Sequence, residues 1–267
     1  MTTTRRKPSL ALRCYGLLVA LLLLLPTLVV VPMSFTDRAS FAFPPKGWST
    51  RWYEKFFTDP LWLDSALYSL RIGVVVAVLA TILGTLGAIG LTNGRGPWRA
   101  PTRGLLLAPM IVPQVITAVG VFYVFLKLQL TQTFAGFVLA HTALAIPFVV
   151  ITVSASLQSF DQQLLRASAS LGAGPVRTFF RITLPLIAPG VLISALFAFL
   201  TSFDEAIVSL FLAGPFTRTL PVQIYQSVTA EVDPTVAAAS TMLLALSTSI
   251  LVGLGVLSMI RERRTKA

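Results

Sequence analysis

The chain has 267 residues, of which 55% are hydrophobic and only 12% are charged, whereas soluble domains carry about 25% charged residues. This composition excludes an ordinary soluble enzyme and a disordered chain, and the single Cys14 and single His141 exclude a disulfide framework and a Cys- or His-rich metal site. We therefore expect an all-α integral membrane protein. The net charge of +11 could indicate a nucleic-acid partner or membrane topology, and the positions of the basic residues distinguish the two.

Six apolar segments predict six transmembrane helices, because a helix needs about 20 mostly apolar residues to cross a bilayer. They cover approximately residues 13–35, 69–92, 104–127, 134–157, 187–213 and 239–260. The first segment resembles a signal peptide, but its apolar run exceeds the roughly 7–15 residues of a signal core and no small-residue cleavage site follows. This favours an uncleaved span, and residues 1–267 are expected to form a single transmembrane domain.

The basic residues predict the orientation. With the N-terminus in the cytoplasm, 14 of the 21 Lys and Arg residues fall in cytoplasmic segments and five in outer segments, while Arg71 and Lys127 lie at outer ends of spans. An excess of Lys and Arg on the cytoplasmic side is the usual bias. Both termini are therefore expected in the cytoplasm. The charge then reflects topology, so membrane lipid and not nucleic acid is the expected partner.

The loop between the first two spans is rich in aromatic residues. Ser49 or Thr50 could cap a short helix from Trp52 to Phe57, lying in the membrane interface. Contact with an external partner is the alternative. Trp48 in this loop, Gln114 and Tyr123 could offer polar or cation–π contacts to a cation, or pack in the ordinary way.

Prolines and a histidine interrupt the central spans. Pro109 and Pro113, one turn apart in the third span, predict a kink that either serves packing or lines a transport path. His141 in the fourth span is interpreted as a hydrogen-bonded interior residue. Ala80, Gly84 and Ala88 in the second span are typical of a helix-packing face.

The long connection at 158–186, which we call the elbow, is patterned. Ser159 or Asp161 can cap a helix that runs to Leu171, Gly172 ends it, and Pro175 begins a second short helix. The pattern predicts a helix–turn–helix projecting into the cytoplasm.

The elbow resembles the coupling loop of the inner-membrane permeases of bacterial binding-protein-dependent ABC importers. That pattern reads Glu-Ala-Ala, three residues, Gly, about nine residues, then Ile-x-Leu-Pro, and it is matched by Ala167, Gly172, Ile182, Leu184 and Pro185. Arg166 stands where the family usually has Glu, and Ser168 where it has the second Ala. The resemblance implies the type I ABC importer permease fold, with a cytoplasmic coupling loop between helices 4 and 5 that docks an ATPase. The charge reversal at Arg166 puts any salt bridge made by the family's Glu in doubt.

Residues 52–70 and 202–228 resemble the spermidine/putrescine subfamily of these permeases. This implies a bacterial inner-membrane subunit that moves a small cationic amine from an extracytoplasmic binding protein into the cytoplasm. It also implies two ATPase copies, which bind the ATP, a related second permease subunit, and no cofactor in this chain. A permease for an aminophosphonate, an opine or ferric iron is the alternative. A self-sufficient secondary carrier is a further one, although no internal repeat is evident. No nucleotide-binding or hydrolase motif occurs, so the chain is not expected to be an enzyme.

Asp204 and Glu205 are the candidate acids of the substrate path. If the fifth span starts near residue 186, Asp204 lies about 27 Å along it, in the outer part of the membrane. Neighbouring helical residues point about 100° apart, so both acids cannot face one pore on a regular helix. The excessive length of 187–213 favours a break, with unwinding at Ser202–Phe203. The acids either bind a cationic amine, pair with Arg71 or Lys127, or face water.

Overall fold

The computed structural model describes residues 10–265 except 95, 160, 162 and 231–232. Its regular elements are helices, with two isolated β-bridges, which confirms the expected all-α class for the described residues. In chain order they are α1 (Leu10–Met33), α2 (Arg51–Thr58), α3 (Pro60–Asn93), α4 (Arg99–Ile111), α5 (Gln114–Lys127), α6 (Phe134–Gln158), α7 (Gln163–Ser170), α8 (Pro175–Thr178), the π-helical turn η1 (Phe179–Thr183), α9 (Leu184–Phe203), α10 (Ile207–Leu212), α11 (Leu220–Ala230) and α12 (Thr235–Thr265).

Helices occupy all six predicted segments. Three are long and apolar enough to cross a membrane alone: Pro60–Thr92, Phe134–Gln158 and Pro175–Phe203. Two bent pairs, Cys14–Leu25 with Thr27–Met33 and Arg99–Ile111 with Gln114–Lys127, would each make one more, and Thr235–Ile250 is a shorter apolar helix. By length and composition the described residues thus contain three spans, or up to five when each bent pair counts as one.

The chain forms two compact units, Met1–Pro60 with Ile224–Leu246, and Leu61–Gln223 with Ser247–Ala267. In the first unit, α2 matches the expected short helix. Trp52 is buried and its Nε1 donates a hydrogen bond to the carbonyl oxygen of Thr36 at 2.7 Å. The hydroxyl groups of Tyr53 and Ser34 are 2.6 Å apart. These contacts make Trp52 and Tyr53 part of a small folded core, whereas Trp48 is 70% exposed.

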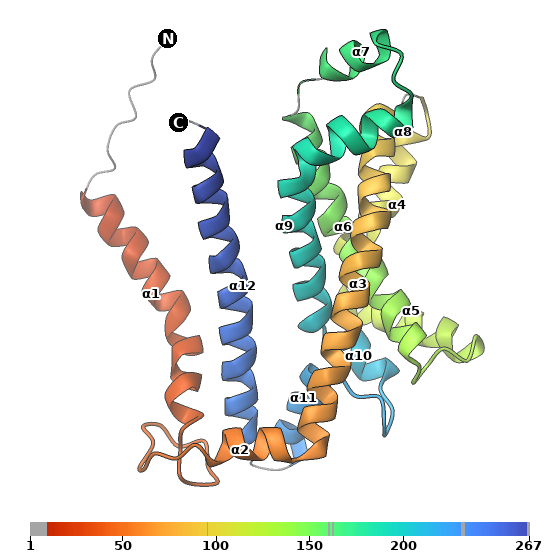
Figure 1. Cartoon of the computed structure of the whole chain (residues 1–267). Helices are drawn as coiled ribbons and strands as arrows, with labels where there is room; N and C mark the ends of the chain where they lie inside the picture. The colour runs from red at the N-terminus through yellow and green to blue at the C-terminus, as the bar shows by residue number, and fades with distance from the viewer. Residues whose placement is uncertain (1–9, 95, 160, 162, 231–232, 266–267) are drawn as a thin grey trace. The chain divides into compact units, whose positions relative to one another are not determined.

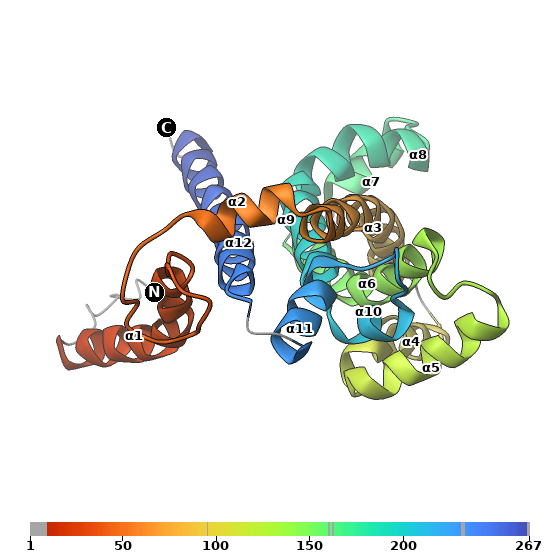
Figure 2. The same cartoon turned by 90° about the horizontal axis from the view of Figure 1, so that it is seen from below.

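In the second unit, α6 is surrounded by α3, α9 and α10 (Figure 2). Its core includes Phe137, Val149 and Val153, all with no exposed surface. The small residues of α3 form the expected packing face: Ala80 and Ala88 are fully buried, and a Cβ at Gly84 would lie 2.6 Å from the Cβ of Val149.

Two helical runs begin before the apolar segments that predicted the second and fifth spans. The helix α3 begins at residue 60 and not 69, because it continues through the polar residues Asp64 and Ser65 although the apolar run does not. In the fifth segment, α9 begins at Leu184, close to the predicted 187, but α8, η1 and α9 form one continuous run from Pro175 to Phe203. In η1 the Leu184 N–H bonds to Phe179 O, the wider spacing of a π turn. Hydropathy reports where apolar residues begin and not where a helix does.

Candidate functional site

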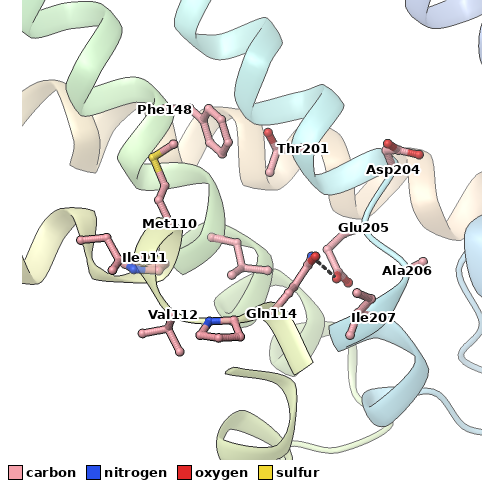
Figure 3. Close-up of a pocket in the computed structure, with 13 residues that line it drawn as sticks. Met110, Ile111, Val112, Gln114, Phe148, Thr201, Asp204, Glu205, Ala206 and Ile207 are labelled. Atoms are coloured by element: carbon pink, nitrogen blue, oxygen red, sulfur yellow. Dashed lines mark hydrogen bonds between the residues drawn. The ribbon is translucent and has the colours of Figure 1, made fainter. Parts of the chain in front are cut away.

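A cavity of about 710 Å³ lies in the second unit between two interrupted helices (Figure 3). Residues 109–114, around the break between α4 and α5, line one part of it. Thr201 and residues 204–207, around the break between α9 and α10, line another, and Leu144 and Phe148 come from α6. Interrupted helices at one place in a membrane protein are typical of a substrate path.

Proline causes the first break. Pro113 has no N–H and restricts the residue before it to an extended conformation, and Val112 has φ −73° and ψ 132°. As a result α4 and α5 meet at 105°. The predicted kink is therefore a sharp turn, so that the third span is not one helix.

The second break lies at residues 204–206, directly after the predicted position. Glu205 is 4% exposed and explains how the break is held. Its Oε1 accepts a hydrogen bond from the backbone N–H of Val208 at 2.8 Å, and its Oε2 accepts one from Ser209 at 2.8 Å. Its Oε1 also accepts a bond from Nε2 of Gln114 at 3.0 Å, drawn in Figure 3. Glu205 thus caps the start of α10 and joins the second break to the first.

Asp204 has different surroundings. Its side chain is exposed and lines the cavity, and Figure 3 shows its carboxylate directed away from the Gln114–Glu205 pair. Within the described part of the chain, its carboxylate has neither a hydrogen-bond donor nor a basic side chain as partner. The two neighbouring acids therefore point apart, because they lie in the break and not on a regular helix.

His141 is an interior residue with both ring nitrogens engaged, as expected. Nδ1 lies 2.9 Å from the hydroxyl oxygen of Ser202 on α9, and Nε2 lies 3.0 Å from that of Ser209 on α10. Nε2 is also 3.6 Å from Oε2 of Glu205. The imidazole therefore joins α6 to both sides of the second break.

The alternative in which the acids pair with Arg71 or Lys127 is not found among the described residues. Backbone N–H groups and Gln114 satisfy Glu205 instead. Lys127 lies 4.4 Å from the ring centre of Tyr123, which is 60% exposed and does not line the cavity. Of the predicted path residues, the structure brings Asp204, Glu205 and Gln114 together.

Sequence reasoning did not single out eight residues that line the cavity, among them Met110, Phe148 and Thr201. Thr201 could have been found, because it lies in the last turn of α9, three residues before the C-cap residue Asp204. Phe148 and Met110 carry no such signal, since they come from other helices.

The elbow contains the two expected short helices, α7 and α8, seen at one end of the second unit in Figure 1. The carboxylate of Asp161 accepts a bond from the Gln163 N–H at 2.8 Å and so caps α7. Gly172 ends the turn with φ +76°, in the left-handed region that favours glycine. Pro175 is the first residue of α8.

The two departures from the family pattern have different surroundings. Ser168 is 5% exposed, and its hydroxyl lies 2.7 Å from that of Thr178, which ties α7 to α8. Arg166 and the matched Ala167 and Gly172 are exposed. Leu184 and Pro185, the last matched residues, open α9. The elbow also exposes large apolar side chains: Leu171 at 88%, Val176 at 69% and Phe180 at 59%.

Comparison with known proteins shows the family. Residues 80–260 match the family described as binding-protein-dependent transport system inner membrane component. The spermidine/putrescine transport system permease protein PotC of Haemophilus influenzae is 33% identical over 231 residues, which cover 86% of this chain and 89% of that protein. The putrescine transport system permease protein PotI of Escherichia coli is 32% identical over 226 residues, or 82% of this chain and 80% of that protein.

The fold is similar to that of a chain in a solved ABC transporter. A chain in the crystal structure of a bacterial alginate ABC transporter, in complex with an alginate pentasaccharide-bound periplasmic protein, aligns with a TM-score of 0.72 at 15% identity, over 93% of this chain and 94% of that one. The chain therefore belongs to the family of binding-protein-dependent ABC importer inner-membrane components.

Proposed function

We propose that this chain is a single-domain permease subunit that imports a small cationic amine of the spermidine/putrescine type. The observation that carries the proposal is Asp204, an unpartnered carboxylate at a cavity between two helix breaks. A carboxylate within hydrocarbon costs about 2.5–3.5 kcal/mol, so a passing ammonium group would relieve that cost. The substrates in the names of the two polyamine permease relatives support the same solute class.

The two acids then have separate roles. Asp204 pairs with the substrate, and Glu205 holds the break at which Asp204 lies. Gln114 belongs to the path by position but is bound to Glu205. Phe148 offers an aromatic face at the cavity, whereas Trp48 and Tyr123, outside its lining, would meet the cation elsewhere on its route.

The partners follow from the family and the elbow. Two ATPase copies bind ATP and dock on the elbow, where exposed Leu171, Val176 and Phe180 supply apolar area. Arg166, in place of the family's Glu, would favour an acidic contact on the ATPase. A sister permease subunit, an extracytoplasmic binding protein and a bacterial inner membrane, with both chain termini in the cytoplasm, complete the proposed assembly. ATP-driven movement of the elbow alternates access to the cavity.

Uptake by the assembled transporter in proteoliposomes, with its binding protein and ATP, tests the site. We expect Asp204→Asn to lower spermidine uptake about tenfold or more, because the substrate loses its counter-charge. The matched control is Asp64→Asn, which neutralises an exposed acid on α3 outside the cavity lining. Unchanged uptake by Asp204→Asn, or equal loss in the control, would remove Asp204 from the path. ATP-independent uptake would favour a secondary carrier, and uptake of an aminophosphonate, an opine or ferric iron in place of amines would reject the amine assignment.

A further inference from the structure

A second cavity, of about 250 Å³, lies in the same unit as the elbow and outside the candidate substrate path. The end of α3, the start of α4 and the end of α6 meet around it. Its polar lining comes from Thr92, Arg99, Arg103, Ser154 and Gln158. Nothing in the proposed transport mechanism uses these groups.

The charge of this cavity is positive and uncompensated. Arg99 and Arg103 are four residues apart on α4, so they lie on one helix face. The cavity lining contains no acid, and within the described part of the chain no carboxylate lies within 4.0 Å of either guanidinium. Two guanidinium groups, each a planar fork of donors, are well suited to the oxygens of a phosphate. The hydroxyl of Ser154 and the amide of Gln158 add neutral donors.

The remaining lining is apolar, which restricts the kind of ligand. Leu107 of α4 and Ile151 of α6 each lie one to two turns along their helices from the polar lining residues. Next to Arg99, Trp98 is 79% exposed, and Leu105 on the same helix is 76% exposed. Exposed Trp beside Arg is typical of the boundary between headgroups and hydrocarbon. A ligand with an anionic head and an apolar body matches both parts.

We propose that this cavity binds the phosphate headgroup of an anionic phospholipid, with an acyl chain along Leu107 and Ile151. Basic pockets between membrane helices at the headgroup level commonly bind such lipids. An acidic segment of the ATPase is a less suitable occupant. It would satisfy the two arginines but would leave the apolar side chains of Trp98 and Leu105 exposed, whereas a lipid covers both. The proposal is independent of which solute the transporter carries.

Delipidated whole transporter, titrated with phosphatidylglycerol or phosphatidylcholine and examined by native mass spectrometry, tests the proposal. We expect the wild type to retain phosphatidylglycerol over phosphatidylcholine. In Arg99→Gln/Arg103→Gln, phosphatidylglycerol binding should fall about tenfold or more, since both guanidinium groups that attract the anionic headgroup are lost. Inorganic phosphate at millimolar concentration should not displace the lipid, because it lacks the acyl chain.

The matched control is Arg177→Gln/Arg181→Gln. These two arginines are also four residues apart, are exposed in the elbow and do not line the cavity, so lipid retention should match the wild type. If the first variant fails to assemble, Arg99→Lys/Arg103→Lys keeps the charge without the planar fork and should retain less lipid than the wild type. Equal lipid loss in the control, undiminished retention in both cavity variants, or displacement by inorganic phosphate would overturn the proposal. Loss of ATPase co-purification with unchanged lipid would instead assign the cavity to a protein contact.

Discussion

Asp204 and Glu205 are adjacent in the sequence, yet their surroundings differ because both lie where the helical run is interrupted, between α9 and α10. Glu205 is buried and accepts hydrogen bonds from two backbone N–H groups and from Gln114, whereas Asp204 is exposed at the cavity. A negative charge alone is therefore not enough to make a residue a candidate for substrate binding, and of the two acids only Asp204 has a carboxylate without a partner in the described part of the chain.

The thermal stability of a Glu205 variant tests whether Glu205, unlike Asp204, has a structural role. Glu205→Ala leaves the N–H groups of Val208 and Ser209 without their partner, at about 1–3 kcal/mol for each unsatisfied buried donor. We expect a clearly lower melting temperature in detergent, while Asp204→Asn, with no bond to lose, keeps the wild-type value. Similar melting temperatures for all three proteins would contradict the capping role of Glu205.

Asp233, ahead of α12 in the first unit, gives a pH-dependent prediction. Burial acts to raise the pKa of its carboxyl, but hydrogen bonds from Thr235 and from Lys55, whose Nζ lies 2.9 Å away, outweigh burial and lower the pKa. A lowered folded-state pKa gives stability that is present above the unfolded pKa of about 3.9 and is lost as the pH falls through the folded value.

We therefore expect Asp233→Asn to cost about 0.2–1 kcal/mol of stability near pH 7, the range for a surface ion pair, since the Lys55 side chain is 43% exposed. Thermal unfolding from pH 7 to pH 3 should show the wild type and the variant converging below about pH 4. A difference that stays constant across this range would mean that the carboxylate charge does not supply the stability.

At the scale of elements, the apolar runs in the sequence located all six helical segments. The positions of the helix breaks could not be predicted from hydropathy alone. Pro113 and Gly172 act through their own backbone, so the break before α5 and the end of α7 could be predicted from sequence. The break at 204–206 could be placed only approximately, because it is held by a bond between Gln114 and Glu205, 91 residues apart. The continuity of α8 with α9 was missed because Pro185 and Pro189 suggested a boundary, whereas Pro185 lies in the first turn of α9 and Pro189 inside it.

Gly172 provides a test of the elbow. A Cβ at Gly172 would meet nothing within 4 Å, so Gly172→Ala acts only through the φ of +76°, at about 1 kcal/mol for an L-residue. We expect the variant to weaken ATPase co-purification. Gly174→Ala is the matched control, since Gly174 has equal space and a φ of −67°. Equal ATPase recovery with both variants would show that docking does not need the Gly172 turn.

At the scale of the whole molecule, the pattern of Lys and Arg predicts which ends of the helices face the cytoplasm. Cys14 is the one cysteine of the sequence, so a Cys14→Ser background allows single-cysteine labelling. Leu171 in the elbow is 88% exposed, and Phe216, between α10 and α11, is 97% exposed. We expect Leu171→Cys to react with a membrane-impermeant maleimide only in inside-out vesicles, and Phe216→Cys only in intact spheroplasts. The reverse pattern would invert the proposed topology and place the elbow out of reach of an ATPase.

The unbroken helical run from Pro175 to Phe203 joins the elbow directly to the residue before Asp204. Figure 1 shows this run bent between α8 and α9, so the lever arm is α9, whose 20 residues are about 30 Å long at 1.5 Å per residue. A pivot of about 5° at the elbow end of α9 would shift its far end by about 3 Å. Because η1 lies close to the pivot, its wider hydrogen-bond spacing makes it the natural place for the lever arm to flex.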